Sequence, residues 1–484
     1  MSEAFTTLDV GVLAAYLIGV TVWGAWLGRG QKGGSDYFLG RRELPWFAVM
    51  LSVVATETST LTFLSIPGVS YLGTLTFLQL TFGYFLGRVA VSLVFLPGYA
   101  SGDITTAYGM LETRFGTGAR RFTSAVFMVT RLLADSVRLF ATAIPLAIIT
   151  GWPYPVSIAA IALLTVVYTY LGGIRAVVWV DALQMGLYLL GGVVALVAIG
   201  SAVEGGWGTV LADAAAAGKL QVLDFSFTLS TPYTFWAGVI GGGFLTMASH
   251  GTDQLIVQRL LTCRDLRASQ KALVGSGIAV LVQFALFLVV GLGLWVYYRT
   301  PTGPRVFDRP DEIFARFIVE GLPPGLTGLL MAGVFAAAMS SLSSSINSLA
   351  SASAYDFWAP LRGITDDGLL LRAGRAFTLI WSALLVGGAV LFIPLSRGTS
   401  AVEVALAVAS LVYGGLLGAF LLGVRGVRAS SAQVALAMSA GIGVVTAIWV
   451  VWTAQVAWPW FVPIGSAVTF TTGRILARTR GAQP

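Results

Sequence analysis

Long apolar runs dominate this chain, and most of them have the length of a membrane-crossing helix. About 20 apolar residues span the hydrocarbon core of a bilayer as an α-helix. Pro and Gly mark the joints between runs, as at Pro97-Gly98 and Pro323-Pro324. The pattern predicts an all-α polytopic membrane protein with about 13 transmembrane helices. They are expected at residues 8–28, 44–73, 74–98, 123–149, 153–171, 178–203, 233–260, 271–298, 325–355, 370–394, 401–424, 431–453 and 457–476.

Two of these runs are interrupted by polar or glycine residues near their centres. The run at 44–73 carries hydroxyl groups and one carboxylate between Ala55 and Thr62, and the run at 233–260 is broken at Gly241–Gly243 and again at His250–Asp253. Broken helices are tolerated at membrane depth where they line a cavity. A pair at corresponding places in two halves predicts an inverted-repeat transporter with a site near the bilayer midplane. We therefore expect one transporter domain, with residues 44–203 as the first repeat, 233–424 as the second, and 8–28 and 431–476 as peripheral helices.

A serine-rich stretch inside the ninth run, AAAMSSLSSSINS at 336–348, has two interpretations. At 100° per residue, Ser340, Ser341 and Ser344 share one helical face, with Ala337 one turn above Ser341. Small residues allow two membrane helices to pack closely. The same hydroxyl and carbonyl oxygens could hold a small hard cation such as Na⁺. The stretch alone leaves both interpretations open.

Composition and charge exclude several classes of protein. Only 11% of the 484 residues are charged, against about 25% in a soluble protein, and the mean hydropathy is +0.84. One cysteine, Cys263, and one histidine, His250, exclude an internal disulfide and a multi-histidine metal centre. The motifs HExxH, GxxxxGK[ST] and GxSxG are absent, so no enzyme activity is expected.

The basic residues predict an orientation instead of a nucleic-acid partner. The net charge is +7, and most Lys and Arg residues fall in the loops of one side. The positive-inside rule then places the N-terminus outside and the C-terminus in the cytoplasm, in a plasma membrane, the inner membrane of a bacterium. The external loop 299–322 is expected to carry a short amphipathic helix.

Charged groups at membrane depth are the first candidates for function, because each costs about 2.5–3.5 kcal/mol on insertion scales. Glu57 could bind the ion or the solute, could be a protonated acid, or could form a buried ion pair with Arg138 or Arg131. Arg131, Asp135 and Arg138, at i, i+4 and i+7, form a structural network, or Arg138 reaches the cavity and binds an anionic solute group. His250 is either a hydrogen-bond partner or a proton relay.

Five stretches of the chain resemble the sodium/solute symporter family, which includes bacterial proline, galactose and sialic-acid symporters. They are YFLGRRELPWF at 37–47, YGMLETRFG at 108–116, YLGGIRAVVWVDALQ at 170–184, HGTDQLIVQRLL at 250–261 and AAAMSSLSSSINSLAS at 336–351. The resemblance implies a leucine-transporter-type core of two inverted five-helix repeats, with additional helices outside it.

The resemblance also implies the sodium ligands. Matching the family's principal sodium site to this chain gives backbone carbonyls of Ala55, Thr58 and Ala337 and the hydroxyls of Ser340 and Ser341. A second sodium site, present in some members, matches Asp181, Ser343 and Ser344, with Ser340 shared. The full set implies sodium as the coupling ion, with two ions bound.

The resemblance does not extend to the solute. Galactose-type members have Asn and Gln where this chain has Glu57 and Thr62, and Thr81, Tyr84 and Ser249 also depart from their pattern. The residues expected around the solute are Glu57, Ser59, Thr62, Thr81, Tyr84, Arg138, Thr246, Ser249 and His250.

The sequence therefore predicts a sodium-coupled secondary active symporter. It would import a small polar solute, such as a sugar, sugar acid, amino acid or carboxylate, by alternating access. A proton-coupled symporter, with Glu57 or His250 titrating, is the first alternative. A non-transporting membrane sensor of a solute is the second.

Overall fold

The computed structural model describes residues 5–100, 104–300, 303–307, 310–394, 401–452 and 455–480. These residues form a bundle of α-helices, with one two-stranded antiparallel hairpin of β1 (Arg299–Thr300) and β2 (Gly303–Pro304). The first half of the chain contains α1 (Thr7–Leu27), α2 (Gly34–Leu39), η1 (Gly40–Arg42), α3 (Trp46–Glu57), α4 (Thr60–Leu72), α5 (Leu78–Val94), α6 (Leu96–Ala100), α7 (Gly109–Phe115), α8 (Thr117–Thr150), α9 (Tyr154–Ala202) and α10 (Gly206–Ala216). The second half contains η2 (Ala237–Gly241), α11 (Gly242–Gly251), α12 (Gln254–Leu260), α13 (Leu266–Tyr297), α14 (Pro310–Glu320), α15 (Leu326–Ala352), η3 (Ser353–Trp358), α16 (Ala359–Arg362), α17 (Asp367–Phe392), α18 (Ala401–Val424), α19 (Ser431–Trp452), η5 (Trp458–Trp460) and α20 (Phe461–Arg480).

Every run that the sequence predicts as a membrane helix falls on helix in this structure. By length and composition, six helices of the described residues could cross a membrane, or seven if the bent pair α3–α4 counts as one span. The 49-residue helix α9 covers two predicted spans and is kinked at Gly173, whose φ is +51°. The number of crossings stays a prediction, whereas the helical class is confirmed.

The predicted break in the run at 44–73 is present, and so is the one at His250–Asp253. The break predicted at Gly241–Gly243 is wrong, because Gly241 and Gly242 keep helical φ and ψ and the helix continues through them as a π-helical turn. Helix α3 ends at Glu57, α4 begins at Thr60, and the two are bent by 64°. The Ser59 side chain caps α4 by accepting a hydrogen bond from the Thr62 amide at 3.3 Å. In the run at 233–260, the π-helical turn (η2) leads into α11, and Asp253 caps α12 by accepting from the Leu255 amide at 2.9 Å.

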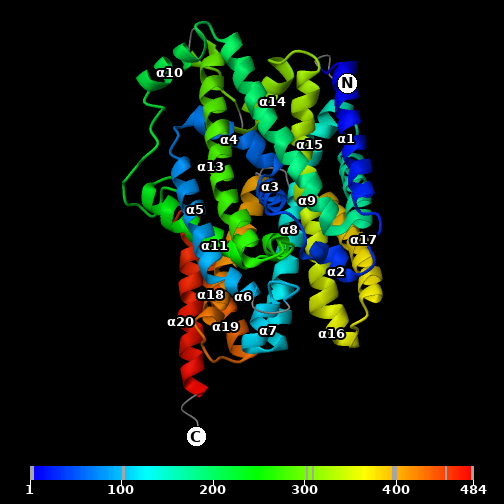
Figure 1. Cartoon of the computed structure of the whole chain (residues 1–484). Helices are drawn as coiled ribbons and strands as arrows, with labels where there is room; N and C mark the ends of the chain where they lie inside the picture. Colours follow the sequence, from blue (N-terminus) through cyan, green and yellow to red (C-terminus); the bar gives the residue numbers. More distant parts are fainter. Residues whose placement is uncertain are drawn as a thin grey trace.

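The serine-rich helix α15 lies in the interior of the bundle. It packs against α9, α1, α17 and α8, and also contacts α3 and α4 on either side of the break. Figure 1 shows the C-terminal helices α18, α19 and α20 together, on the opposite side of the molecule from α1 and α17. The amphipathic helix predicted within the loop 299–322 is confirmed as α14, which packs against α4.

Glycines hold α5 against the second broken helix. A methyl group added at Gly83 would lie 2.1 Å from the Gly238 carbonyl oxygen, and one at Gly87 would lie 2.5 Å from the Gly243 carbonyl oxygen. The backbones of α5 and of η2–α11 are therefore in direct contact, as small residues spaced by four allow in membrane helices. This contact sets one wall of the cavity described next.

Candidate functional site

The helix break and the serine run, predicted separately from the sequence, lie side by side in the structure. The hydroxyls of Thr56 and Ser344 are 3.1 Å apart, and the Thr60 hydroxyl donates to the Val334 carbonyl at 3.1 Å. A small cavity of about 20 Å³ lies between α4, α8 and α15 and is lined by Ser59, Ser341 and their neighbours. Residues more than 270 positions apart are thus brought to one place.

The oxygen atoms at this contact suit a sodium ion. The Thr58 amide makes the last helical hydrogen bond of α3, to Val54 at 3.0 Å, so the carbonyls of the final turn have no partner within the helix. The Ser341 hydroxyl donates to the Ala337 carbonyl at 3.1 Å. The Ser340 hydroxyl is buried and has no hydrogen-bond partner among the described residues. Buried oxygens in this situation are the ligands that a hard cation needs in place of water.

A second group of buried oxygens surrounds Asp181 on α9. Its Oδ2 accepts hydrogen bonds from the Ser52 hydroxyl at 2.6 Å and from Arg259 at 3.1 Å, whereas its Oδ1 has no partner among the described residues. Arg259 is fully buried and also donates to the Ser344 hydroxyl. Ser343 donates to the Ser340 carbonyl at 3.1 Å. Arg259, which the sequence did not point to, therefore contacts both Asp181 and Ser344.

A larger cavity, of about 310 Å³, opens beside the break. Eight of the nine predicted solute-binding residues line it: Glu57, Ser59, Thr62, Tyr84, Arg138, Thr246, Ser249 and His250. Thr81 does not, because its buried hydroxyl donates to the Leu78 carbonyl at 2.7 Å. Thr81 therefore has a local packing role within α5.

Glu57 forms a buried ion pair, and its partner is Arg88 of α5, neither Arg138 nor Arg131. Arg88 is fully buried and also donates to the Ser276 hydroxyl at 3.0 Å and to the Tyr84 carbonyl at 3.2 Å. The Glu57 side chain is 22% exposed, toward the cavity. The carboxylate is thus paired with Arg88 and still presents an acceptor to a solute.

His250 joins the same group in its neutral form. Its Nε2 lies 3.1 Å from a guanidinium nitrogen of Arg88, and its Nδ1 lies 2.8 Å from the Ser249 hydroxyl. Arginine can only donate, so Nε2 must accept, and the neutral ring carries its proton on Nδ1. Protonation of His250 would place two donors and two positive charges in contact, so the arrangement is that of a hydrogen-bond partner.

The three charged groups of α8 combine both interpretations of the sequence. Arg131 pairs with Asp253 and lies 3.7 Å from Asp135, while Arg138 lies 3.2 Å from Asp135. Asp135 also accepts a hydrogen bond from Ser345 at 2.5 Å, which ties this network to the serine run. The Arg138 side chain is 24% exposed and lines the cavity, whereas that of Arg131 is 6% exposed. Arg138 is the cation that a solute can reach.

Aromatic side chains form the other end of the cavity, and sequence reasoning missed most of them. The rings of Phe77 and Tyr233 are 5.3 Å apart, those of Phe77 and Phe284 are 5.1 Å apart, and Trp458 completes the lining. Aromatic residues are frequent throughout membrane helices and interfaces. No local signal distinguishes these from the others. Tyr84 was predicted only because its position matches a solute-binding position of galactose-type members of the family.

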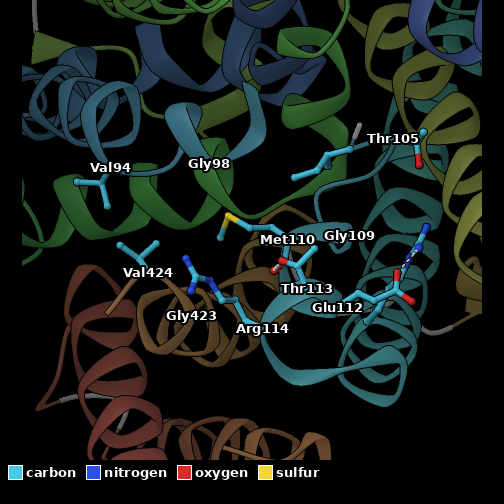
Figure 2. Close-up of a pocket in the computed structure, with 12 residues that line it drawn as sticks. Val94, Gly98, Thr105, Gly109, Met110, Glu112, Thr113, Arg114, Gly423 and Val424 are labelled. Carbon is cyan, nitrogen blue, oxygen red and sulfur yellow. Dashed lines mark hydrogen bonds and ion pairs between the residues drawn. The ribbon is translucent and has the colours of Figure 1, made fainter. Parts of the chain in front are cut away.

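Another cavity, of about 490 Å³, lies away from this site. Figure 2 shows it between α5, α6, α7 and α18, with Arg114 reaching toward Val424 and Met110 nearby. None of the predicted ion-binding or solute-binding residues lines it.

Comparison with known proteins connects this geometry to a family. A profile described as the sodium:solute symporter family matches residues 37–441. The sodium/sialic acid symporter SiaT of Proteus mirabilis is 30% identical over 453 residues, which are 92% of this chain and 88% of the relative. The human sodium-coupled monocarboxylate transporter 1 is 28% identical, over 93% of this chain and 74% of the relative.

A solved structure agrees with the whole fold. The substrate-bound outward-open state of a Na⁺-coupled sialic acid symporter superposes with a TM-score of 0.87 at 27% identity, covering 98% of both chains.

Proposed function

This chain belongs to the sodium:solute symporter family, and we propose that it imports a small carboxylate-bearing solute through the cavity beside Glu57 and Arg138. As a member of that family it is a sodium-coupled symporter of the membrane and not an enzyme. The observation that carries the proposal is the shared lining of one cavity by an ionised acid and an accessible arginine. Both lie next to the break where a sodium ion fits.

Sodium, in this proposal, acts on the geometry of the broken helix. The ion binds the carbonyls of Ala55, Thr58 and Ala337 and the hydroxyls of Ser340 and Ser341. These ligands come from both sides of the contact between α3 and α15, so the ion holds the break against the serine run. Ser59 and Thr62, which follow directly on α4, are thereby set in the wall of the cavity. Solute and sodium binding are then reciprocally coupled.

A second sodium ion is proposed beside Asp181, Ser343 and Ser344. Its support is the unpartnered Oδ1 of Asp181 and the unpartnered hydroxyl of Ser340. Arg259 already neutralises the other oxygen of Asp181, so this ion would bind more weakly than the first.

The solute would be held by charge at two places. Arg138 has guanidinium N–H groups beyond the one given to Asp135, and a planar carboxylate is the group that arginine binds best. Glu57, as an acceptor held by Arg88, suits hydroxyl or ammonium groups elsewhere on the same solute. SiaT and the monocarboxylate transporter are both named for carboxylate-containing solutes, which agrees with this class.

We further propose the organisation of the chain in its membrane. Residues 44–203 and 233–424 form the two repeats, and 8–28 and 431–476 lie outside them. The N-terminus is outside and the C-terminus is in the cytoplasm, in a bacterial inner membrane.

The test is uptake by proteoliposomes under an imposed sodium gradient. Solutes are first selected by thermal shift from a panel of hydroxy acids, sugar acids, amino acids and neutral sugars, with and without sodium. We expect sodium to drive uptake of a carboxylate and to leave the neutral sugars outside. Uptake that follows a proton gradient and ignores sodium would contradict the coupling.

Proton coupling is the alternative to be excluded in the same experiment. It predicts a steep dependence on external pH that disappears in Glu57→Gln. The contact of the His250 Nε2 with the Arg88 guanidinium disfavours a proton on that nitrogen, so Glu57 is the group that this pH dependence tests.

A further inference from the structure

A segment outside the helices contributes to the cavity wall. Residues 217–236 connect α10 to η2, and most of them have no regular secondary structure. Tyr233 from this segment lines the cavity together with Phe77 and Phe284. We call residues 224–235 the strap. Figure 1 shows the chain descending from α10 toward α5 and α11 along the outside of the bundle.

The strap is held mainly by polar contacts at a few points. Phe225 and Phe227 are 60% and 69% exposed, so they do not anchor it in the core. Before the strap, the Lys219 ammonium donates to the carbonyls of Tyr71 and Gly73 at the end of α4. Within it, the Leu229 carbonyl accepts from the Ala457 amide at 2.7 Å.

One side chain clamps both ends of the strap. Gln79, in the first turn of α5, is fully buried. Its Oε1 accepts from the Asp224 amide at 2.8 Å, and its Nε2 donates to the Tyr233 carbonyl at 3.1 Å. The Phe235 amide donates to the Asp224 carbonyl at 2.7 Å and closes the loop behind it. A buried amide that uses both its donor and its acceptor on one loop fixes the position of that loop.

We infer that Gln79 is a positioning residue that holds Tyr233 across the mouth of the solute cavity, so that the strap limits access to Glu57 and Ser249 from that side. Tyr233 contacts the solute, and Gln79 acts through it. The inference concerns the cavity of the proposed function, but it can be tested without transport and without a known solute.

The single native cysteine makes an access measurement practical. Cys263 is 5% exposed, and burial raises the pKa of its thiol to about 12, so its thiolate is scarce near neutral pH. A Cys263→Ser background carrying Ser249→Cys places one reactive thiol in the wall of the cavity. The rate of its modification by a charged, membrane-impermeant methanethiosulfonate reagent is measured in right-side-out vesicles.

Gln79→Leu and Tyr233→Ala should each raise this rate about tenfold. Gln79→Leu removes the buried hydrogen bonds that hold the strap closed, and Tyr233→Ala removes the ring itself, so each variant should expose the cavity about ten times more often. The double variant should label no faster than Tyr233→Ala alone, because Gln79 acts through the ring. The matched control is Gln270→Leu, which removes a glutamine that donates to the Ser92 carbonyl at 3.0 Å and does not contact the strap. Its rate should equal that of the parent.

Other results overturn the inference. If Gln79→Leu leaves the rate unchanged while Tyr233→Ala raises it, Gln79 does not position the ring. If neither changes it, or if Gln270→Leu raises it equally, the strap does not control access. Where Gln79→Leu is not recovered in the membrane, Gln79→Glu keeps the acceptor for Asp224 and removes the donor to Tyr233, and the same comparison applies.

Discussion

At the scale of single residues, Ser341 is the sharpest test of the ion site. It faces the small cavity beside the break and donates to the Ala337 carbonyl at 3.1 Å. Ser341→Ala removes one proposed ligand and should raise the apparent dissociation constant for sodium about tenfold, which corresponds to about 1.4 kcal/mol of binding free energy. The measurement is sodium-dependent thermal stabilisation of the purified protein, followed by sodium-dependent uptake.

Ser348→Ala is the control for Ser341→Ala. Ser348 lies on the same helix, α15, and is fully buried, and its hydroxyl only returns to the Ser345 carbonyl at 3.1 Å. The dissociation constant of the Ser348→Ala variant for sodium should equal that of the parent protein. Equal behaviour of the two variants would mean that the serines of α15 serve helix packing alone.

The Glu57–Arg88 pair predicts different outcomes for stability and for transport. Glu57→Gln leaves the fully buried Arg88 without its counter-charge and should destabilise the protein by about 3–5 kcal/mol. Glu57→Gln combined with Arg88→Met removes both charges and should recover most of the thermal stability. Transport should stay lost in both, because Gln keeps only a neutral amide oxygen where the solute would meet the negatively charged carboxylate.

The comparison of these two variants separates a structural pair from a solute ligand. Recovery of uptake along with stability in the double variant would show that Glu57 serves only to neutralise Arg88. Thermal unfolding and uptake are therefore measured on the same preparations.

Charged residues could be found from the sequence, but their partners could not. Glu57 and Asp181 stand out because charges in apolar runs are rare. The contact of Glu57 with Arg88, or of Asp181 with Arg259, depends on the rotation and register of one helix against another. Neighbours in sequence, such as Asp135 and Arg138, were predicted because a single helix fixes their spacing.

At the scale of elements, the helix breaks were predictable and the strap was not. A helix end depends on residues that are neighbours in the sequence, such as Gly and a side chain that caps the next helix. Ser59 and Asp253 are such caps and mark the start of α4 and α12. The strap has no periodicity, and Gln79 and Tyr233 are joined by contacts between segments about 150 residues apart.

The glycine contact between α5 and η2–α11 can be tested with a matched pair of variants. Gly83→Ala would place its methyl group 2.1 Å from the Gly238 carbonyl oxygen, between two backbones that cannot yield easily. We expect a loss of about 1–3 kcal/mol from overpacking, measured as a lower midpoint of thermal unfolding. Gly186→Ala on α9, with no atom within 4 Å of the added group, should be neutral or slightly stabilising. Equal stability of the two variants would contradict the close contact.

At the scale of the whole molecule, hydropathy and the two breaks predicted the architecture, and family membership and the solved relative confirm it. The apolar runs give the helices, and each break lies in the first helix of a predicted repeat. Hydropathy cannot supply the number of sodium ions. That number depends on whether the buried carboxylate of Asp181, which already pairs with Arg259, also binds a second ion.

The number of sodium ions follows from a thermodynamic measurement on the intact transporter. With a tenfold sodium gradient and no membrane potential, one coupled ion permits about tenfold accumulation of solute and two permit about 100-fold, since each factor of ten is about 1.4 kcal/mol. For a monoanionic carboxylate, one sodium moves no net charge, whereas two move one charge, worth about 2.3 kcal/mol per 100 mV. An imposed potential of about 100 mV, inside negative, should therefore raise accumulation about 50-fold if two ions are coupled. We expect this voltage dependence, because Asp181 keeps one carboxylate oxygen free beside Ser340 while Arg259 holds the other. Tenfold accumulation that ignores voltage would instead mean that the guanidinium of Arg259 serves as the fixed cation of this site and that one sodium ion drives transport.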